Sequence, residues 1–280
     1  MSIRISVVAS VSLLLSIGAA AAGEITAQET GVGLLLTGQE AVEFLQTAEV
    51  SSKPEDFDDL AITSPRRLEL TRDDLTLRVI FKDENTLHRG TFRYGDGREV
   101  PMVTDSYKHE IAAFELDLML GLDIVPPCVE RKLFNRKGSL CLWVEGSRTM
   151  AERHEQGFEP PDRLRWHEQL LTIRLFQQVI SDQDYSNIRN IIFDRDYRLY
   201  KIDSSMAFYS ESRLIDQLNT PQYSRQFLTA LESLDRDQLE ERLSPWLHKA
   251  QRKSLWVRRD RILERAKNLI AEHGEDKMLY

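Results

Sequence analysis

Residues 181–203 read SDQDYSNIRNIIFDRDYRLYKID. A polar loop rich in Asp and Asn is followed by two short apolar segments, 191–193 and 199–202, which predict a β-hairpin that ends at Asp203. Carboxylate and amide oxygens are the ligands that divalent cations prefer when they also bind phosphates. Taken singly, each of these residues is more simply explained by an Asx-rich turn or by a cap at the end of a strand.

Two charged residues upstream of this loop change that interpretation. Lys82 closes an apolar strand of sequence VIFK, and Glu110 lies near the start of a predicted helix, on the border of its buried face. A carboxylate in that position needs a cationic partner, and Lys82 is a candidate because the helix follows the strand. A strand Lys, a helix Glu, a loop Asp with Asn and a hairpin Asp follow the order of parts in a phosphoryl-transfer site.

The first half of the chain is typical of an α+β lobe. Residues 38–49 predict a short helix that buries Ala41, Val42 and Leu45. A stretch around 94–97 predicts an exposed turn. The other predicted elements are strands at 67–70, 75–81, 128–134 and 140–144, the last two joined by a turn at 135–138, and a helix at 107–120 capped by Asp105 or Ser106 and ended by Gly121.

The second half of the chain is mostly helical. A helix that begins after Asp162 and reaches Ile180 has an apolar stripe that starts at Leu164. Further helices are predicted from about 223 and from about 245 to 272, and the basic residues of the last one predict a solvated face. We therefore expect two lobes, 23–145 with an antiparallel sheet and one key helix, and 146–280 with mainly helices.

The first 22 residues predict a cleaved signal peptide. Arg4 precedes an apolar run, and four alanines end at Ala22. The run is too short and too rich in serine for a bilayer span, so we expect export to the periplasm or the medium without stable membrane insertion. The net charge of −8 argues against nucleic acid as a partner. Cys128 and Cys141 fit either a disulfide, which export permits, or small buried apolar residues.

Several stretches together carry a resemblance to a known family. They include the 79–82 strand, the 110–114 helix turn, residues 120–127 (LGLDIVPP), residues 139–146 (SLCLWVEG) and residues 203–208 (DSSMAF). With these, most of the chain resembles exported bacterial kinase-like proteins related to phosphatidylinositol 3- and 4-kinases and to secreted protein kinases. The resemblance implies a two-lobed protein-kinase-like fold that uses ATP and Mg²⁺ or Mn²⁺.

The resemblance also implies roles for individual residues. Lys82 holds the α- and β-phosphates and is positioned by Glu110, while Asp203 binds the metal ion that bridges the phosphates. The remaining implied contacts are a hinge at Trp143, Val144 and Glu145 that meets adenine, and a loop over the phosphates that contains Thr63 and Ser64.

The catalytic loop departs from the family pattern of Asp, four residues, Asn. Asp182 and Asn187 keep that spacing, whereas Asn190 keeps the usual distance to Asp203 and pairs with Asp184 across a one-residue insertion. We favour Asp184 and Asn190, because a loop tolerates an insertion better than a paired hairpin does. The expected activity is phosphoryl transfer from ATP to an unidentified protein, lipid or sugar hydroxyl. The alternatives are an inactive kinase-like binding module and a nucleotidyl transferase.

Overall fold

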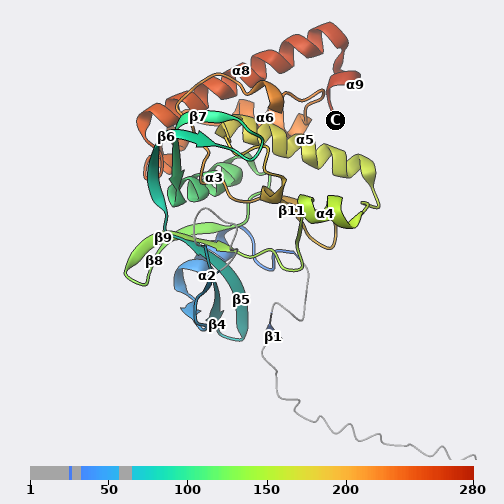
Figure 1. Ribbon diagram of the computed structural model, residues 1–280. Coiled ribbons are helices and arrows are strands. Elements are labelled where there is room, and N and C mark those ends of the chain that lie inside the picture. Colours follow the sequence, from blue (N-terminus) through green and yellow to red (C-terminus); the bar gives the residue numbers. More distant parts are fainter. Residues whose placement is uncertain (1–24, 27–32, 57–64) are drawn as a thin grey trace, which may run out of the picture.

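A computed structural model describes residues 25–26, 33–56 and 65–280 (Figure 1). Within these residues, seven strands form one curled sheet in the N-terminal lobe, with the path β2-β4-β5-β9-β8 and with β1 and β3 paired to β5 and β4. The strands are β1 (Ile25–Thr26), β2 (Glu49–Val50), β3 (Glu55–Asp56), β4 (Arg66–Arg72), β5 (Leu75–Lys82), β8 (Cys128–Leu133) and β9 (Arg136–Leu142).

The core of this lobe forms where one face of the sheet meets helix α2 (Gly38–Thr47). Leu77, Val79 and Phe81 alternate along β5 and are buried, as period-two patterning requires. On α2 the fully buried residues are Ala41, Phe44 and Leu45, and Val42, predicted to face inward, is half-buried and packs against the same core. The prediction missed Phe44, whose ring is fully buried in this core.

Helix α3 (Tyr107–Leu120) connects the two lobes. Ser106 is its N-cap and accepts from the N–H of Lys108 at 3.3 Å, and Gly121 ends it in the left-handed conformation, both as predicted. The helix contacts β8 and β9 on one side and helices of the second lobe on the other, so it is buried on nearly all faces.

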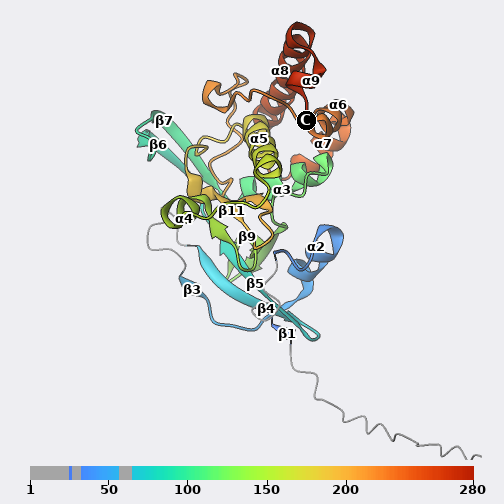
Figure 2. The same ribbon diagram turned by 90° about the vertical axis from the view of Figure 1, so that its right-hand side faces the viewer.

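The C-terminal lobe is mainly helical and holds a small three-stranded sheet, β10-β11-β12 (Figure 2). Among the described helices, none combines the length and the apolar character that crossing a bilayer requires. The elements are β10 (Arg148–Thr149), α4 (Met150–Gln156), α5 (Arg163–Ile180), η1 (Ile188–Asn190), β11 (Ile191–Phe193), β12 (Leu199–Lys201), η2 (Asp216–Leu218), α6 (Arg225–Ser233), α7 (Arg236–Leu243), α8 (Lys249–His273) and α9 (Glu275–Met278).

Two predictions in this lobe are corrected. Leu164, expected to start the buried stripe of α5, is 69% exposed, and Trp166 is buried in that turn instead. The basic face predicted for the last helix is not all solvated. Arg258 on α8 is fully buried and donates to the carbonyl oxygens of Val179 and Tyr209 at 2.8 and 2.9 Å.

The polar stretch that contains the predicted turn at 94–97 is a long β-hairpin, β6 (Asn85–Arg93) and β7 (Glu99–Ser106). Most of β6 is exposed on both faces, so its sequence lacks the alternation that marks a half-buried strand. The turn itself is present, but Tyr94 is buried rather than exposed.

Strands β8 and β9 form a hairpin closed by a disulfide between Cys128 and Cys141, which face each other in the strand register. This settles the two alternatives for the cysteines. The turn lies at Phe134 and Asn135, both with positive φ, and not at 135–138 as predicted. Gly138 lies within β9, opposite Arg131. The position requires glycine, because a Cβ there would stand 2.3 Å from the carbonyl oxygen of Lys82.

Candidate nucleotide and metal site

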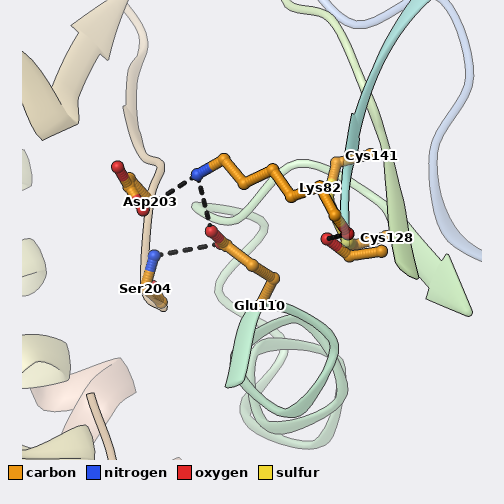
Figure 3. The surroundings of a disulfide bond; sticks show 7 residues. Lys82, Glu110, Cys128, Cys141, Asp203 and Ser204 are labelled. Atoms are coloured by element: carbon orange, nitrogen blue, oxygen red, sulfur yellow. Dashed lines mark hydrogen bonds and ion pairs between the residues drawn. A yellow bond between two sulfur atoms is a disulfide. The ribbon is translucent and has the colours of Figure 1, made fainter. Parts of the chain in front are cut away.

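Three charged side chains meet between the lobes (Figure 3). The Nζ atom of Lys82, at the end of β5, donates to Glu110 Oε1 at 2.9 Å and to Asp203 Oδ1 at 2.8 Å. Glu110 comes from the first turn of α3, and Asp203 follows β12. Residues that are 28 and 121 positions away from Lys82 in the chain thus converge on one ammonium group.

The backbone after Asp203 completes this cluster. Asp203 has a φ of 54°, a left-handed conformation that Asp adopts more readily than most residues. Beyond it, the N–H of Ser204 donates to Glu110 Oε2 at 3.0 Å, and Ser205 Oγ donates to Asp203 Oδ1 at 3.1 Å. Both oxygens of Glu110 are therefore occupied, whereas Oδ2 of Asp203 makes no hydrogen bond within the described part of the chain.

Electrostatics keep the cluster ionised. Burial disfavours the charge on Lys82, but the two carboxylates outweigh it and raise the pKa of the ammonium group above its ordinary value. Burial likewise opposes ionisation of Asp203, and the charge and hydrogen bond of Lys82 nevertheless hold the pKa of this carboxyl well below its usual range. The site thus presents a fixed cation next to a fixed anion.

The loop after α5 brings a second group of polar side chains close together. Asp184 Oδ2 accepts from Asn187 Nδ2 at 3.0 Å and from Asn190 Nδ2 at 2.9 Å. Asn190 lies in η1 directly before β11 and is 5% exposed. Both asparagines proposed from the sequence therefore bind the same carboxylate, and burial raises the pKa of Asp184 to about 6.

Asp182, the alternative catalytic residue, lies in a different environment. Its side chain is fully buried and forms an ion pair with Lys201 at 3.2 Å, a lysine that is itself fully buried. Lys201 also donates to the carbonyl oxygens of Ile202 and Asp203, at 2.6 and 2.9 Å. Asp182 thus supports the backbone beneath Asp203 and has no surface toward a substrate.

The predicted hinge lies where β9 passes into the second lobe. The N–H of Trp143 donates to the carbonyl oxygen of Arg78 at 3.0 Å, and the N–H of Glu145 donates to that of Gly33 at 2.9 Å. The Glu145 carboxylate forms an ion pair with Arg78, whose Nε is 3.0 Å from Oε1. Val144 is buried in a small apolar cluster with Ile192 and Tyr200, against which Leu34 and Ile202 pack. Thr63 and Ser64 lie outside the described residues.

The donor set fits a cation that is shared with phosphates. Within the described residues, no group of three or more His, Cys, Asp or Glu side chains forms a metal cage. Asp203 Oδ2 and the amide oxygen of Asn190 are hard oxygen donors, and Asp203 is 39% exposed at its side chain. Such a site would need phosphate oxygens and water to complete the coordination of Mg²⁺ or Mn²⁺.

Sequence reasoning missed several residues around the site. Asp105, predicted as a helix cap, is buried instead, and burial together with the nearby Asp203 raises its pKa to about 6, although Ser205 opposes the shift. The buried ion pair of Lys201 could have been expected from the sequence, since a lysine in an apolar strand just before Asp203 needs a buried partner. Tyr94 and Arg98 could not, because the hairpin that carries them has no pattern in the sequence.

Comparisons with known proteins identify the fold. No family model matches the chain, and no curated protein matches it. Its structure resembles that of hydra Fam20 with sugar, with a TM-score of 0.63 over 91% of this chain and 97% of that one, at 12% identity. A Helicobacter pylori proinflammatory kinase, CtkA, matches with a TM-score of 0.47 over 84% and 94% of the two chains, at 11% identity. The chain has a kinase-like fold.

Proposed function

We propose that this protein binds ATP with Mg²⁺ or Mn²⁺ and transfers the γ-phosphoryl group to a hydroxyl acceptor. The observation that carries the proposal is the contact of Lys82 with both Glu110 and Asp203, at 2.9 and 2.8 Å. A lysine fixed beside a half-exposed carboxylate offers one charge for phosphate oxygens and another for the metal ion. In a kinase-like fold these are the two charges that phosphoryl transfer needs.

The remaining residues take roles that follow from their positions. Asp203 and Asn190 would hold the divalent cation, which neutralises charge on the phosphates when it is bound. Asp184 would accept the proton of the attacking hydroxyl, since Asp182 is fully buried in its ion pair with Lys201. The backbone at 143–145 would meet adenine, and Thr63 and Ser64 would cover the phosphates.

We further propose that the protein acts outside the cytoplasm. The first 22 residues read as a signal peptide, and the disulfide between Cys128 and Cys141 is of a kind that persists in oxidising compartments.

ADP formation by purified residues 23–280 tests the transfer reaction. With ATP and Mg²⁺ or Mn²⁺, and water as the acceptor, we expect slow turnover that falls at least a hundredfold in Asp203→Asn and in Asp184→Asn. Asp196→Asn is the matched control, because Asp196 is exposed on the β11–β12 turn. Turnover that survives both site substitutions would overturn the proposal.

A further inference from the structure

The β6–β7 hairpin links the candidate site to the second lobe. It leaves the sheet directly after Lys82 and returns to α3 just before Glu110. Figure 1 shows it rising from the sheet to the level of the C-terminal helices, and Figure 2 shows it projecting to one side of them. Midway along the hairpin, Tyr209 donates from its hydroxyl to the carbonyl oxygen of Met102 on β7. The hairpin therefore forms a wall beside the catalytic loop.

Arg98 fastens the tip of the hairpin to that loop. Its Nη2 donates to the carbonyl oxygen of Gln183 at 2.6 Å, and its guanidinium lies 4.7 Å from the ring centre of Tyr94 and 4.2 Å from that of Tyr185. Its Nε is fixed by Asp96 Oδ2 at 2.6 Å. One arginine thus binds the residues on either side of Asp184 to the turn that carries Tyr94.

Tyr94 has a buried hydroxyl without a partner. The residue is 4% exposed, and its oxygen makes no hydrogen bond within the described part of the chain. A buried hydroxyl in this state is costly unless a bound group hydrogen-bonds to it, so it is available to a ligand oxygen. Burial raises the pKa of Tyr94, and the charge of Asp184 raises it further, so the hydroxyl stays a donor. Its position next to the loop of Asp184 follows from the contacts of Arg98 with Tyr94, Gln183 and Tyr185.

Asp184 has an unused oxygen as well. Both asparagines donate to Oδ2, while Oδ1 makes no hydrogen bond to a side chain among the described residues. The tip of the hairpin thus brings an unpaired donor into the neighbourhood of an unpaired acceptor. An alcohol oxygen needs these two partners at once, because it donates one proton and accepts through its lone pairs.

We propose that Tyr94 and Asp184 together bind the acceptor hydroxyl. The hydroxyl donates to Asp184 Oδ1 and accepts from the Tyr94 hydroxyl, which makes Tyr94 a residue that positions the acceptor. During transfer the acceptor oxygen bonds to the γ-phosphorus, its proton passes to Asp184, and the bond from the γ-phosphorus to the bridging oxygen breaks with its electron pair leaving on ADP. The inference rests on the proposed phosphoryl transfer.

A groove between the hairpin and the catalytic loop has room for the rest of an acceptor. Its volume is about 420 Å³, and it is lined on one side by the hairpin and on the other by the catalytic loop and the segment after β12. Its lining includes Val100, Pro101, Tyr209 and Arg213, and also Gln183, the neighbour of Asp184 in the chain. An alcohol that carries polar groups fits this mixture of apolar and hydrogen-bonding side chains.

The variant Tyr94→Phe tests the inference, with water as the acceptor. We expect kcat for ADP formation to fall about tenfold, as the loss of one hydrogen bond to the reacting oxygen predicts, while KM for ATP stays unchanged. Tm should be equal or higher, since the change removes a buried hydroxyl without a partner. Tyr280→Phe is the control, because it removes a hydroxyl that donates to Glu168 at 2.9 Å elsewhere in the lobe.

The outcomes separate the two proposals. Unchanged kcat in Tyr94→Phe, with ATP turnover intact, overturns the role of Tyr94 and leaves the proposed function standing. A lower Tm with a parallel loss of ATP binding would mean that Tyr94 is only structural. Absence of ADP formation in the unmodified protein overturns the proposed function, and the acceptor site with it.

Discussion

At the scale of single residues, His109 shows how the chain supports its site without contacting a ligand. It lies next to Glu110 on α3 and is 3% exposed. Its Nδ1 donates to the carbonyl oxygen of Ser205 at 2.8 Å, and its Nε2 accepts from Gln251 at 3.1 Å. Only the neutral ring with its proton on Nδ1 satisfies both partners, and this ring fixes the segment after Asp203 to α8.

A pH dependence of stability follows from His109. Burial lowers its pKa to about 4, the Ser205 carbonyl opposes the shift, and His248 adds to it. The unfolded chain binds this proton near pH 6.5, so the stability that His109 contributes is complete above that pH and is lost as pH falls from 6.5 to 4, by roughly 3 kcal/mol. Asp105 and Asp184, whose pKa values are raised to about 6, titrate in the same range with the opposite sign. Urea unfolding of both proteins across that range should therefore show the unmodified protein losing stability relative to His109→Gln as pH falls from 6.5 to 4. An equal slope in both proteins would contradict this role.

The sequence predicted the environments of single residues less completely than it predicted helices and strands. The apolar strand that ends at Lys82 and the buried edge that carries Glu110 were enough to suggest the pair, and the structure brings Asp203 to the same ammonium group. The environments of Asp182 and Asp184 could not be told apart, because their difference depends on the buried Lys201. Which of the two carboxylates is fully buried depends on tertiary contacts, and the spacing of residues in the sequence does not reveal those contacts.

At the scale of elements, the segment 33–36 lies against the predicted hinge at 143–145. Gly33 accepts the N–H of Glu145, and Leu34 packs on Val144 and its neighbours. A Cβ at Gly33 would lie 2.8 Å from Asp194 Oδ2, so the close approach requires glycine. This segment occupies the surface on which the proposed function places the adenine base.

We predict that ATP competes with Leu34 for that surface. Leu34→Ala should therefore bind ATP several-fold more tightly than the unmodified protein, because a larger fraction of the molecules has this surface free for the base. Leu35→Ala is the matched control, since Leu35 packs on the core of the N-terminal lobe and not on the cluster around Val144. Equal affinities in an ATP titration of all three proteins would exclude the competition.

At the scale of the whole molecule, the predicted two-lobed kinase-like fold is confirmed. Periodicity found α2, α3, α5 and the strands with buried faces, because burial on one side leaves a pattern in the sequence. The strands of the β6–β7 hairpin were missed, since an exposed hairpin has no such pattern. The disulfide stayed one of two alternatives, because the spacing of two cysteines does not prove a bridge. The proposed nucleotide site lies between the lobes, where Lys82, Glu110 and Asp203 meet.

Thermal unfolding of residues 23–280 with ATP, alone and with Mg²⁺ or Mn²⁺, tests that site most directly. ATP at about a hundred times its Kd should stabilise the protein by roughly 2.7 kcal/mol, a rise of several degrees in Tm. We predict a rise that requires the metal ion, that disappears in Asp203→Asn, and that persists in Asp196→Asn. An unchanged Tm in well-folded protein with every nucleotide and metal, including in Leu34→Ala, would contradict the account.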